Sequence, residues 1–144
     1  MWTAIVAHNG LLATGRNQDW ASHAIAAQLS AEYNATHGAT LSVLLPNWAE
    51  YVYENNLPRF VQFANRVFDV EVDFYDQKNT AREGIRRLRE FFGFLGGPVV
   101  LEDIGVKSDD KFKKMASNAC RFGNIGGIKS LNEEDVMNIY KLAL

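Results

Sequence analysis

Residues 19–38 have the sequence DWASHAIAAQLSAEYNATHG, and this stretch decides the expected fold. Asp19 is suited to cap a helix, because its carboxylate can accept hydrogen bonds from the free N–H groups of a first turn. The helix is expected to run to about Tyr33 near the centre of the domain. Asn34 can end it, since asparagine favours turns over helix interiors. The stretch therefore predicts a central helix that stops before His37.

Apolar residues recur at helical spacing along the rest of the chain, whereas the alternation typical of strands is scarce. A second helix is expected to carry Leu41, Leu44, Leu45 and Trp48 on one face. The same spacing predicts helices around residues 60–67, 85–95, 112–119 and 136–143. The pattern therefore predicts one all-α domain of six to seven helices, spanning residues 1–144.

Three helix starts are expected from local sequence. Thr80 with Glu83, and Ser130 with Glu133, have the spacing of a capping box. In such a box each side chain binds the backbone N–H group of the other residue. Ser108 is expected to cap the helix that lies between these two.

The composition is that of an ordinary globular domain and argues against several functions. The chain has 144 residues, of which 47% are hydrophobic and 22% charged, enough for one core. A net charge of −2 argues against a nucleic-acid partner. No apolar run reaches the length of a membrane span, and residues 1–13 lack the basic start of a signal peptide. The single cysteine, Cys120, excludes an intramolecular disulfide, and this favours a reducing compartment such as the cytoplasm. We therefore expect a cytoplasmic protein and, since no membrane span is present in the sequence, no membrane partner.

The apolar start of the chain, with Trp2, Ile5 and Val6, has two explanations. It can be an element that another segment covers, or a short N-terminal helix packed on its own domain. Composition favours neither.

The chain has three histidines, His8, His23 and His37. His23 and His37 are fourteen residues apart, a separation of about 21 Å on an unbroken helix. They could share a metal ion only if the chain leaves the helix between them and folds back, as Asn34 permits. Because isolated histidines are more often ordinary core or surface residues, their spacing alone is a weak indication of a metal site.

Other polar clusters have structural explanations. Four arginines share a helix with two interleaved glutamates, which is typical of a solvated face: Arg82, Arg86, Arg87, Arg89, Glu83 and Glu90. Residues 123–127 lack the GxGxxG spacing of a nucleotide-binding loop and follow no expected strand. Cys120 has no histidine near it in sequence, so a small buried residue is a better explanation than a nucleophile.

Several motifs occur in a characteristic order. Residues 19–38 are followed by LLPNW at 44–48, RFVQFA at 59–64 and LNEEDV at 131–136. In this order they resemble the iron-dependent alcohol dehydrogenase family, and its butanol-dehydrogenase branch in particular. The resemblance spans nearly the whole chain. It implies the C-terminal, all-α helical domain of the iron-dependent alcohol dehydrogenase / dehydroquinate synthase-like fold.

The resemblance also implies which residues belong to the site. The family signature has one histidine, a second four residues later and a third fourteen residues after the first. The first and third bind a divalent metal, iron or zinc, and match His23 and His37. The middle one, which lines the catalytic cleft, falls at Ala27, whose methyl group cannot relay a proton. The family's aspartate and further histidine ligands have no counterpart upstream of His23, so the metal site is expected to be weak and open.

The activity that the resemblance implies is NAD(P)-dependent oxidation of a small alcohol, such as butanol, or reduction of an aldehyde. We expect no catalytic and no cofactor-binding residue in this chain, because the family's N-terminal nucleotide-binding domain has no counterpart here. The isolated chain is expected to be inactive, and to pair with a separate nucleotide-binding domain or with itself. The alternative, which Ala27 favours, is a non-catalytic helical module for folding or interaction.

One surface property follows from the same implied arrangement. In the family the face around the two ligand histidines lies opposite the nucleotide-binding domain. That face is therefore expected to be apolar and exposed in this chain, with Trp20, Ala24, Ala27 and the apolar start from Trp2 to Val6 on it.

Overall fold

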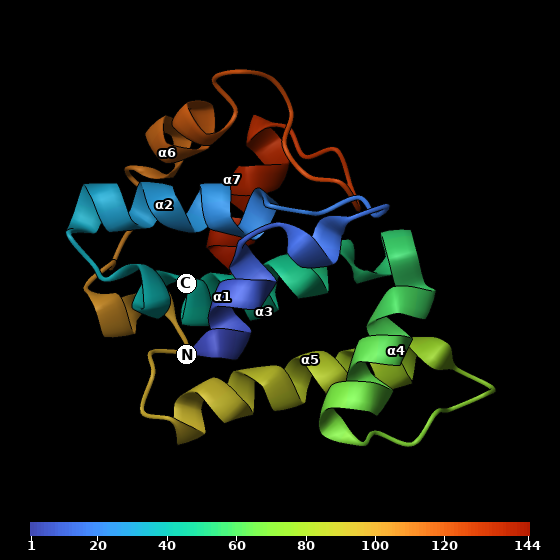
Figure 1. Cartoon of the computed structure of the whole chain (residues 1–144). Helices are drawn as coiled ribbons and strands as arrows, with labels where there is room; N and C mark the ends of the chain where they lie inside the picture. The colour runs from blue at the N-terminus through green and yellow to red at the C-terminus, as the bar shows by residue number, and fades with distance from the viewer.

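A computed structural model describes all 144 residues. The chain forms α-helices that are connected by short loops and 3-10 turns (Figure 1). The helices are α1 (Trp2–His8), α2 (Ala21–Tyr33), α3 (His37–Val52), α4 (Leu57–Phe68), α5 (Gln77–Phe94), α6 (Phe112–Ala119) and α7 (Glu133–Leu142). The 3-10 turns are η1 (Leu11–Ala13), η2 (Tyr53–Asn56) and η3 (Leu101–Ile104). The structure has two isolated β-bridges and no strand. The predicted all-α fold is confirmed.

Helices α2 and α3 form the centre of the molecule. Helix α2 packs against α3 and α6, and α3 also packs against α5 and α7, so that α3 runs between α2 and α5 in Figure 1. Ile25 and Leu29 of α2 are fully buried, as are Val43 and Leu44 of α3. The central position predicted for α2 is confirmed.

The break between α2 and α3 occurs at Asn34, as predicted. Asn34 has a left-handed backbone with a φ angle of 52°, which asparagine adopts at less cost than most residues. Thr36 is extended, and α3 begins at the next residue, His37. The chain therefore reverses direction within three residues and lays α3 alongside α2.

Helices α4 and α5 pack closely because a glycine lies at their contact. A methyl group built on Gly84 of α5 would lie 2.4 Å from the Cβ atom of Ala64 in α4. No L side chain fits at that distance, so the two backbones approach more closely than any larger pair would allow. This contact sets the position of α4 at one edge of the molecule (Figure 1).

The start of α5 differs from the prediction. The helix begins at Gln77, and its cap is Asp76, whose carboxylate accepts a hydrogen bond from the Lys78 N–H group at 3.0 Å. Thr80 lies inside the helix, and its hydroxyl accepts a hydrogen bond from the Asp73 N–H group at 2.8 Å. The predicted box of Thr80 and Glu83 is wrong, because the loop before α5 uses the threonine hydroxyl.

Helix α6 also starts later than predicted. It begins at Phe112 after Lys111, while the Ser108 hydroxyl donates to Asp110 at 2.6 Å. The predicted cap at Ser108 is therefore wrong.

The capping box of α7 is likewise shifted, by two residues. The Asn132 side chain accepts from the Asp135 N–H group at 2.9 Å, and the Asp135 carboxylate accepts from the Asn132 N–H group at 3.0 Å. The predicted box of Ser130 and Glu133 is wrong. Asparagine caps as well as serine does, and the aspartate at the third helical position completes the pair.

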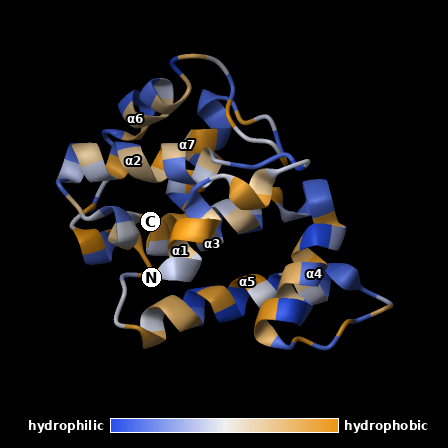
Figure 2. Cartoon of the chain, viewed as in Figure 1, coloured by the Kyte–Doolittle hydropathy of each residue, from blue (hydrophilic) through white to orange (hydrophobic).

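Helix α1 is the least integrated element. Its sequence is largely apolar (Figure 2), yet none of its residues is buried. Trp2 is 77% exposed, and Ile5 is exposed as well. Among all the helices, none has both the length and the apolar character needed to cross a bilayer.

Candidate metal site at the start of helices α2 and α3

The two histidines of the predicted site come together. His23 is the third residue of α2 and His37 the first of α3. The Nδ1 atom of His23 lies 3.1 Å from the Nε2 atom of His37. The predicted proximity of the two rings is confirmed, and it arises from the reversal at Asn34.

This spacing fits two ligands of one metal ion. Imidazole nitrogens bind zinc at about 2.1 Å, and two nitrogens on one tetrahedral or octahedral ion are then roughly 3.0–3.4 Å apart. No group of three or more histidine, cysteine, aspartate or glutamate side chains in the structure is arranged to hold a metal. His23 and His37 therefore offer two ligand positions, and their role as ligands stays a prediction.

The protonation state of His23 suits a ligand. Burial lowers its pKa below the ordinary value, and the nearby His37 and His8 lower it further, because each would repel a second positive charge. Metals bind neutral imidazole, so a lowered pKa keeps the ring available at neutral pH. His37 is exposed at the surface, which leaves room for further ligands beside it.

Two more rings flank the histidine pair. The ring of Trp20 lies 4.9 Å from that of His23, between centroids. The ring of His8, at the end of α1, lies 5.3 Å from Trp20 and 5.9 Å from His23, edge-on to both. Sequence reasoning gave His8 no role here, and the only signal for it was that the chain has just three histidines. Its position depends on the packing of α1, which local sequence does not reveal.

Ala27 lies on α2 four residues after His23 and is exposed. Residues four apart share one face of a helix, so Ala27 presents a methyl group beside the histidine pair. This position provides neither a hydrogen-bond donor nor a proton carrier.

The apolar residues that were expected to be exposed around the site are exposed only in part. Trp2, Ile5 and Trp20 are exposed, whereas Val6 and Ala24 are half-buried. The apolar start of the chain does not cover a core of its own, since α1 contributes no buried residue.

The solvated face expected on α5 is confirmed only in part. Arg82 and Arg86 are exposed. Arg87, however, donates to the Phe68 carbonyl oxygen at 2.7 Å, and Arg89 donates to the side-chain oxygen of the buried Asn47 at 2.9 Å, so these two arginines connect α5 to α4 and α3.

The structural explanation for Cys120 is supported. Cys120 is buried, and burial raises the pKa of its thiol, with Glu133 and Asp135 adding to the effect. A thiol that stays protonated is a poor nucleophile.

The sequence matches the family model described as "Fe-containing alcohol dehydrogenase family, C-terminal" over residues 1–144. It is 39% identical to NADH-dependent butanol dehydrogenase A of Clostridium acetobutylicum, over 98% of this chain and 36% of that protein. It is also 39% identical to the probable NADH-dependent butanol dehydrogenase 1 of Bacillus subtilis, over 100% of this chain and 37% of that protein.

The fold agrees with this likeness. The crystal structure of NADH-dependent butanol dehydrogenase A from Thermotoga maritima superposes with a TM-score of 0.89 and 34% identity, over 99% of this chain and 37% of that one. The chain thus spans little more than a third of the length of these relatives. Sequence and fold together show that it belongs to the iron-containing alcohol dehydrogenase family, where it corresponds to the C-terminal helical domain of the butanol dehydrogenases.

Proposed function

We propose that His23 and His37 supply two ligands of the divalent metal site, iron or zinc, of an NAD(P)-dependent alcohol dehydrogenase. The observation that carries this proposal is the 3.1 Å between their ring nitrogens. The other ligands and the nucleotide site would come from a part of the full-length protein outside residues 1–144. The substrate would be a small alcohol such as butanol, or the corresponding aldehyde, as the names of the relatives indicate.

Each residue of the site has a definite part in this proposal. A bound divalent ion would act as a Lewis acid on the alcohol or aldehyde oxygen. His23 and His37 would hold the ion in place. The Trp20 ring, whose centroid lies 4.9 Å from that of His23, would limit the orientations of the His23 ring. Ala27 would transfer no proton, so any proton relay would need a group from elsewhere.

By itself the chain would be inactive. It would act with a nucleotide-binding domain, in the cytoplasm, where the buried and unpaired Cys120 would stay reduced. Ala27 supports a second candidate function, a non-catalytic helical folding or interaction module, because it removes the side chain that would relay a proton. In that case His23 and His37 would only form a hydrogen bond with each other.

Metal binding tests the ligand roles directly. Zn²⁺ titrated calorimetrically into the 144-residue chain should bind weakly at one site, and His23→Ala or His37→Ala should abolish binding. His8→Ala tests the third histidine of the site and should keep most of the binding, because the His8 ring lies 5.9 Å from that of His23, edge-on, and the only hydrogen-bond contact of the His23 and His37 rings joins them to each other. Unchanged binding in His37→Ala would disprove the metal assignment and favour the non-catalytic module.

A chimera tests the activity. Fusing the chain to the preceding part of the butanol dehydrogenase A of Clostridium acetobutylicum should yield NADH-dependent butyraldehyde reduction, whereas the isolated chain with added iron or zinc should show none. In the chimera, Ala27→His should raise kcat and His37→Ala should remove activity. Turnover by the isolated chain would contradict the expected inactivity, and an inactive but folded chimera would support the helical module.

A further inference from the structure

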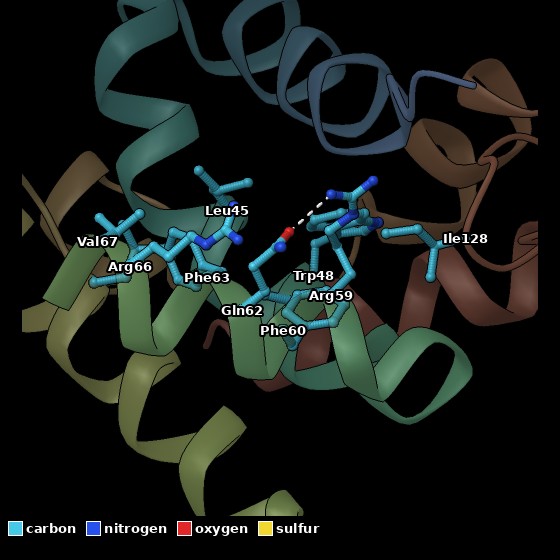
Figure 3. A pocket seen from close by; sticks show the side chains of 11 residues that line it. Leu45, Trp48, Arg59, Phe60, Gln62, Phe63, Arg66, Val67 and Ile128 are labelled. Atoms are coloured by element: carbon cyan, nitrogen blue, oxygen red, sulfur yellow. Dashed lines mark hydrogen bonds between the residues drawn. The ribbon is translucent and has the colours of Figure 1, made fainter. Parts of the chain in front are cut away.

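A second candidate site lies at the other end of α3 from His37. It is a pocket of about 400 Å³ lined by residues of α3, α4 and α5 and by Ile128 of the loop before α7 (Figure 3). Trp48 of α3 lines it, eleven residues from His37, which is about 16 Å along a helix. The volume falls within the range of small-molecule sites.

The lining of the pocket is almost wholly apolar, and its polar side chains lie at the edge. Eight of its eleven lining residues are hydrophobic, with Leu45, Phe60 and Phe63 among them. The other three are Arg59, Gln62 and Arg66, and none of the eleven is acidic. Figure 3 shows Gln62 between the two arginines, which all come from α4. The pocket therefore combines an apolar wall with positive charge at its edge.

The two arginines form no ion pair within the chain. The ion pairs of the structure use arginines of α5, such as Arg82 and Arg86, and none involves Arg59 or Arg66. The one side-chain hydrogen bond of the pair runs from Arg59 to Gln62, at 2.9 Å. Helix α4 itself contains no acidic residue. The charge beside the pocket is thus unpaired, although the chain as a whole is acidic.

The wall of the pocket holds another unpaired donor. Trp48 is 8% exposed, and its indole nitrogen is buried without a hydrogen-bond partner. Buried donors are almost always satisfied in folded proteins, so this unpaired donor distinguishes Trp48 from the other apolar lining residues. Two exposed guanidinium groups and a buried, unpaired indole N–H group thus lie around one apolar wall.

We propose that this pocket binds an amphipathic carboxylate, a medium-chain aliphatic acid. Its chain would lie against Leu45, Phe60 and Phe63, and its carboxylate would pair with Arg59 or Arg66. Guanidinium groups hold carboxylates through two parallel hydrogen bonds, which are roughly twice as strong as neutral ones. The neutral alcohol of equal length would lose this contact, and a cationic amphiphile would be repelled.

Fluorescence of Trp48 provides a local readout. In a chain carrying Trp2→Phe and Trp20→Phe, Trp48 is the only remaining tryptophan. Decanoate, titrated below its micellar concentration, should change this emission saturably, with one equivalent bound by calorimetry. Arg59→Gln with Arg66→Gln should weaken binding at least about tenfold. Lys107→Gln with Lys113→Gln is the matched control, since it removes the same charge from exposed positions outside the pocket.

Four outcomes would overturn the proposal. Equal binding of decanoate and 1-decanol would show an apolar pocket without anion recognition. Unchanged affinity in the double arginine variant would show that the arginines take no part in binding. Several equivalents bound would show adsorption to exposed apolar surface elsewhere, such as that of α1. Binding to vesicles of anionic phospholipid through the two arginines, without binding of free decanoate, would show a membrane-facing surface instead. Circular dichroism of each variant would verify that the helical fold is intact.

Discussion

The carboxylate of Asp19 accepts a hydrogen bond from the backbone N–H group of Gly127 at 2.8 Å, across 108 residues of sequence. The same oxygen accepts from the Ile128 N–H group at 2.8 Å, and the other oxygen accepts from the Ala21 N–H group at 2.8 Å. One carboxylate therefore joins the start of α2, four residues before His23, to the loop that precedes α7. The loop has little slack, because a methyl group on Gly127 would lie 2.9 Å from the Gln18 carbonyl oxygen.

Replacing Asp19 by asparagine should destabilise the fold by about 2–3 kcal/mol, because hydrogen bonds to a charged acceptor are among the stronger ones. Urea unfolding measures this loss, and faster amide exchange at Gly127 and Ile128 locates it. Asp109→Asn is the matched control and should change stability by less than about 0.5 kcal/mol, since the Asp109 side chain is exposed. Equal losses in both variants would show that Asp19 acts only through its charge.

Replacing Gly84 by alanine should separate α4 from α5. The added methyl group would lie 2.4 Å from the Ala64 Cβ atom, and overpacking of this kind costs about 1–3 kcal/mol. Gly93→Ala in the same helix is the matched control, because its methyl group would meet only Val99 at 3.6 Å. That control should be neutral or stabilise the protein by up to about 1 kcal/mol, as alanine favours helix. Thermal unfolding of both variants measures the two changes in stability. An unchanged stability of Gly84→Ala would contradict the close contact between α4 and α5.

Asp135 should make stability depend on acid pH. Burial alone would raise the pKa of its carboxyl, but hydrogen bonds from Lys129, the Asn132 N–H group and Tyr51 outweigh burial and hold the pKa below its ordinary value. A lowered folded-state pKa contributes stability above the unfolded pKa of about 3.9, and that stability is lost as pH falls through the lower, folded value.

Asp135→Asn should therefore cost about 2 kcal/mol at pH 7, and the difference from the unsubstituted protein should shrink below about pH 4. Urea unfolding of both proteins across pH 2–7 measures this difference in stability. Glu134→Gln, on the same first turn of α7 but exposed, should show a small difference at every pH. A difference for Asp135→Asn that stays constant down to pH 2 would refute the titration argument.

The exposed start of the chain should drive self-association. Trp2 and Ile5, three residues apart on α1, both leave large apolar side chains in contact with water, and apolar surface of this kind favours association. Sedimentation should show a dimer or larger species that binds a hydrophobic dye, and Trp2→Ser with Ile5→Ser should reduce both signals. Phe74→Ser with Tyr75→Ser, which removes two exposed aromatic rings from the loop before α5, should not. A dye-silent monomer would instead support the independent helical module.

Local sequence determined much of this fold. Helix α2 and its end at Asn34 follow from the preference of asparagine for a turn, and the apolar stripes of α3, α4 and α7 follow from helical periodicity. These features depend on neighbours within one or two turns, so they can be predicted without knowing the rest of the chain. The family motifs added that His23 and His37 should meet, which neither their spacing nor their residue type could establish alone.

Tertiary structure decided which of several suitable side chains caps each helix. Thr80 had the spacing for a cap, but a loop N–H group takes its hydroxyl. Asn132 rather than Ser130 caps α7, where Asp135 also binds Lys129 and Tyr51. Such choices depend on partners that only the folded chain brings near.

The approach of His8 to His23, and of Asp19 to Gly127, also required the folded chain. Segments distant in sequence meet only when burial of the common core, around residues such as Ile25, outweighs the entropy of closing the loop between them. No local sequence pattern shows whether burial of the core outweighs this entropy cost. The sequence by itself therefore determined where helices form and end, and the packing of α1 and of the loop before α7 determined which side chains surround the histidine pair.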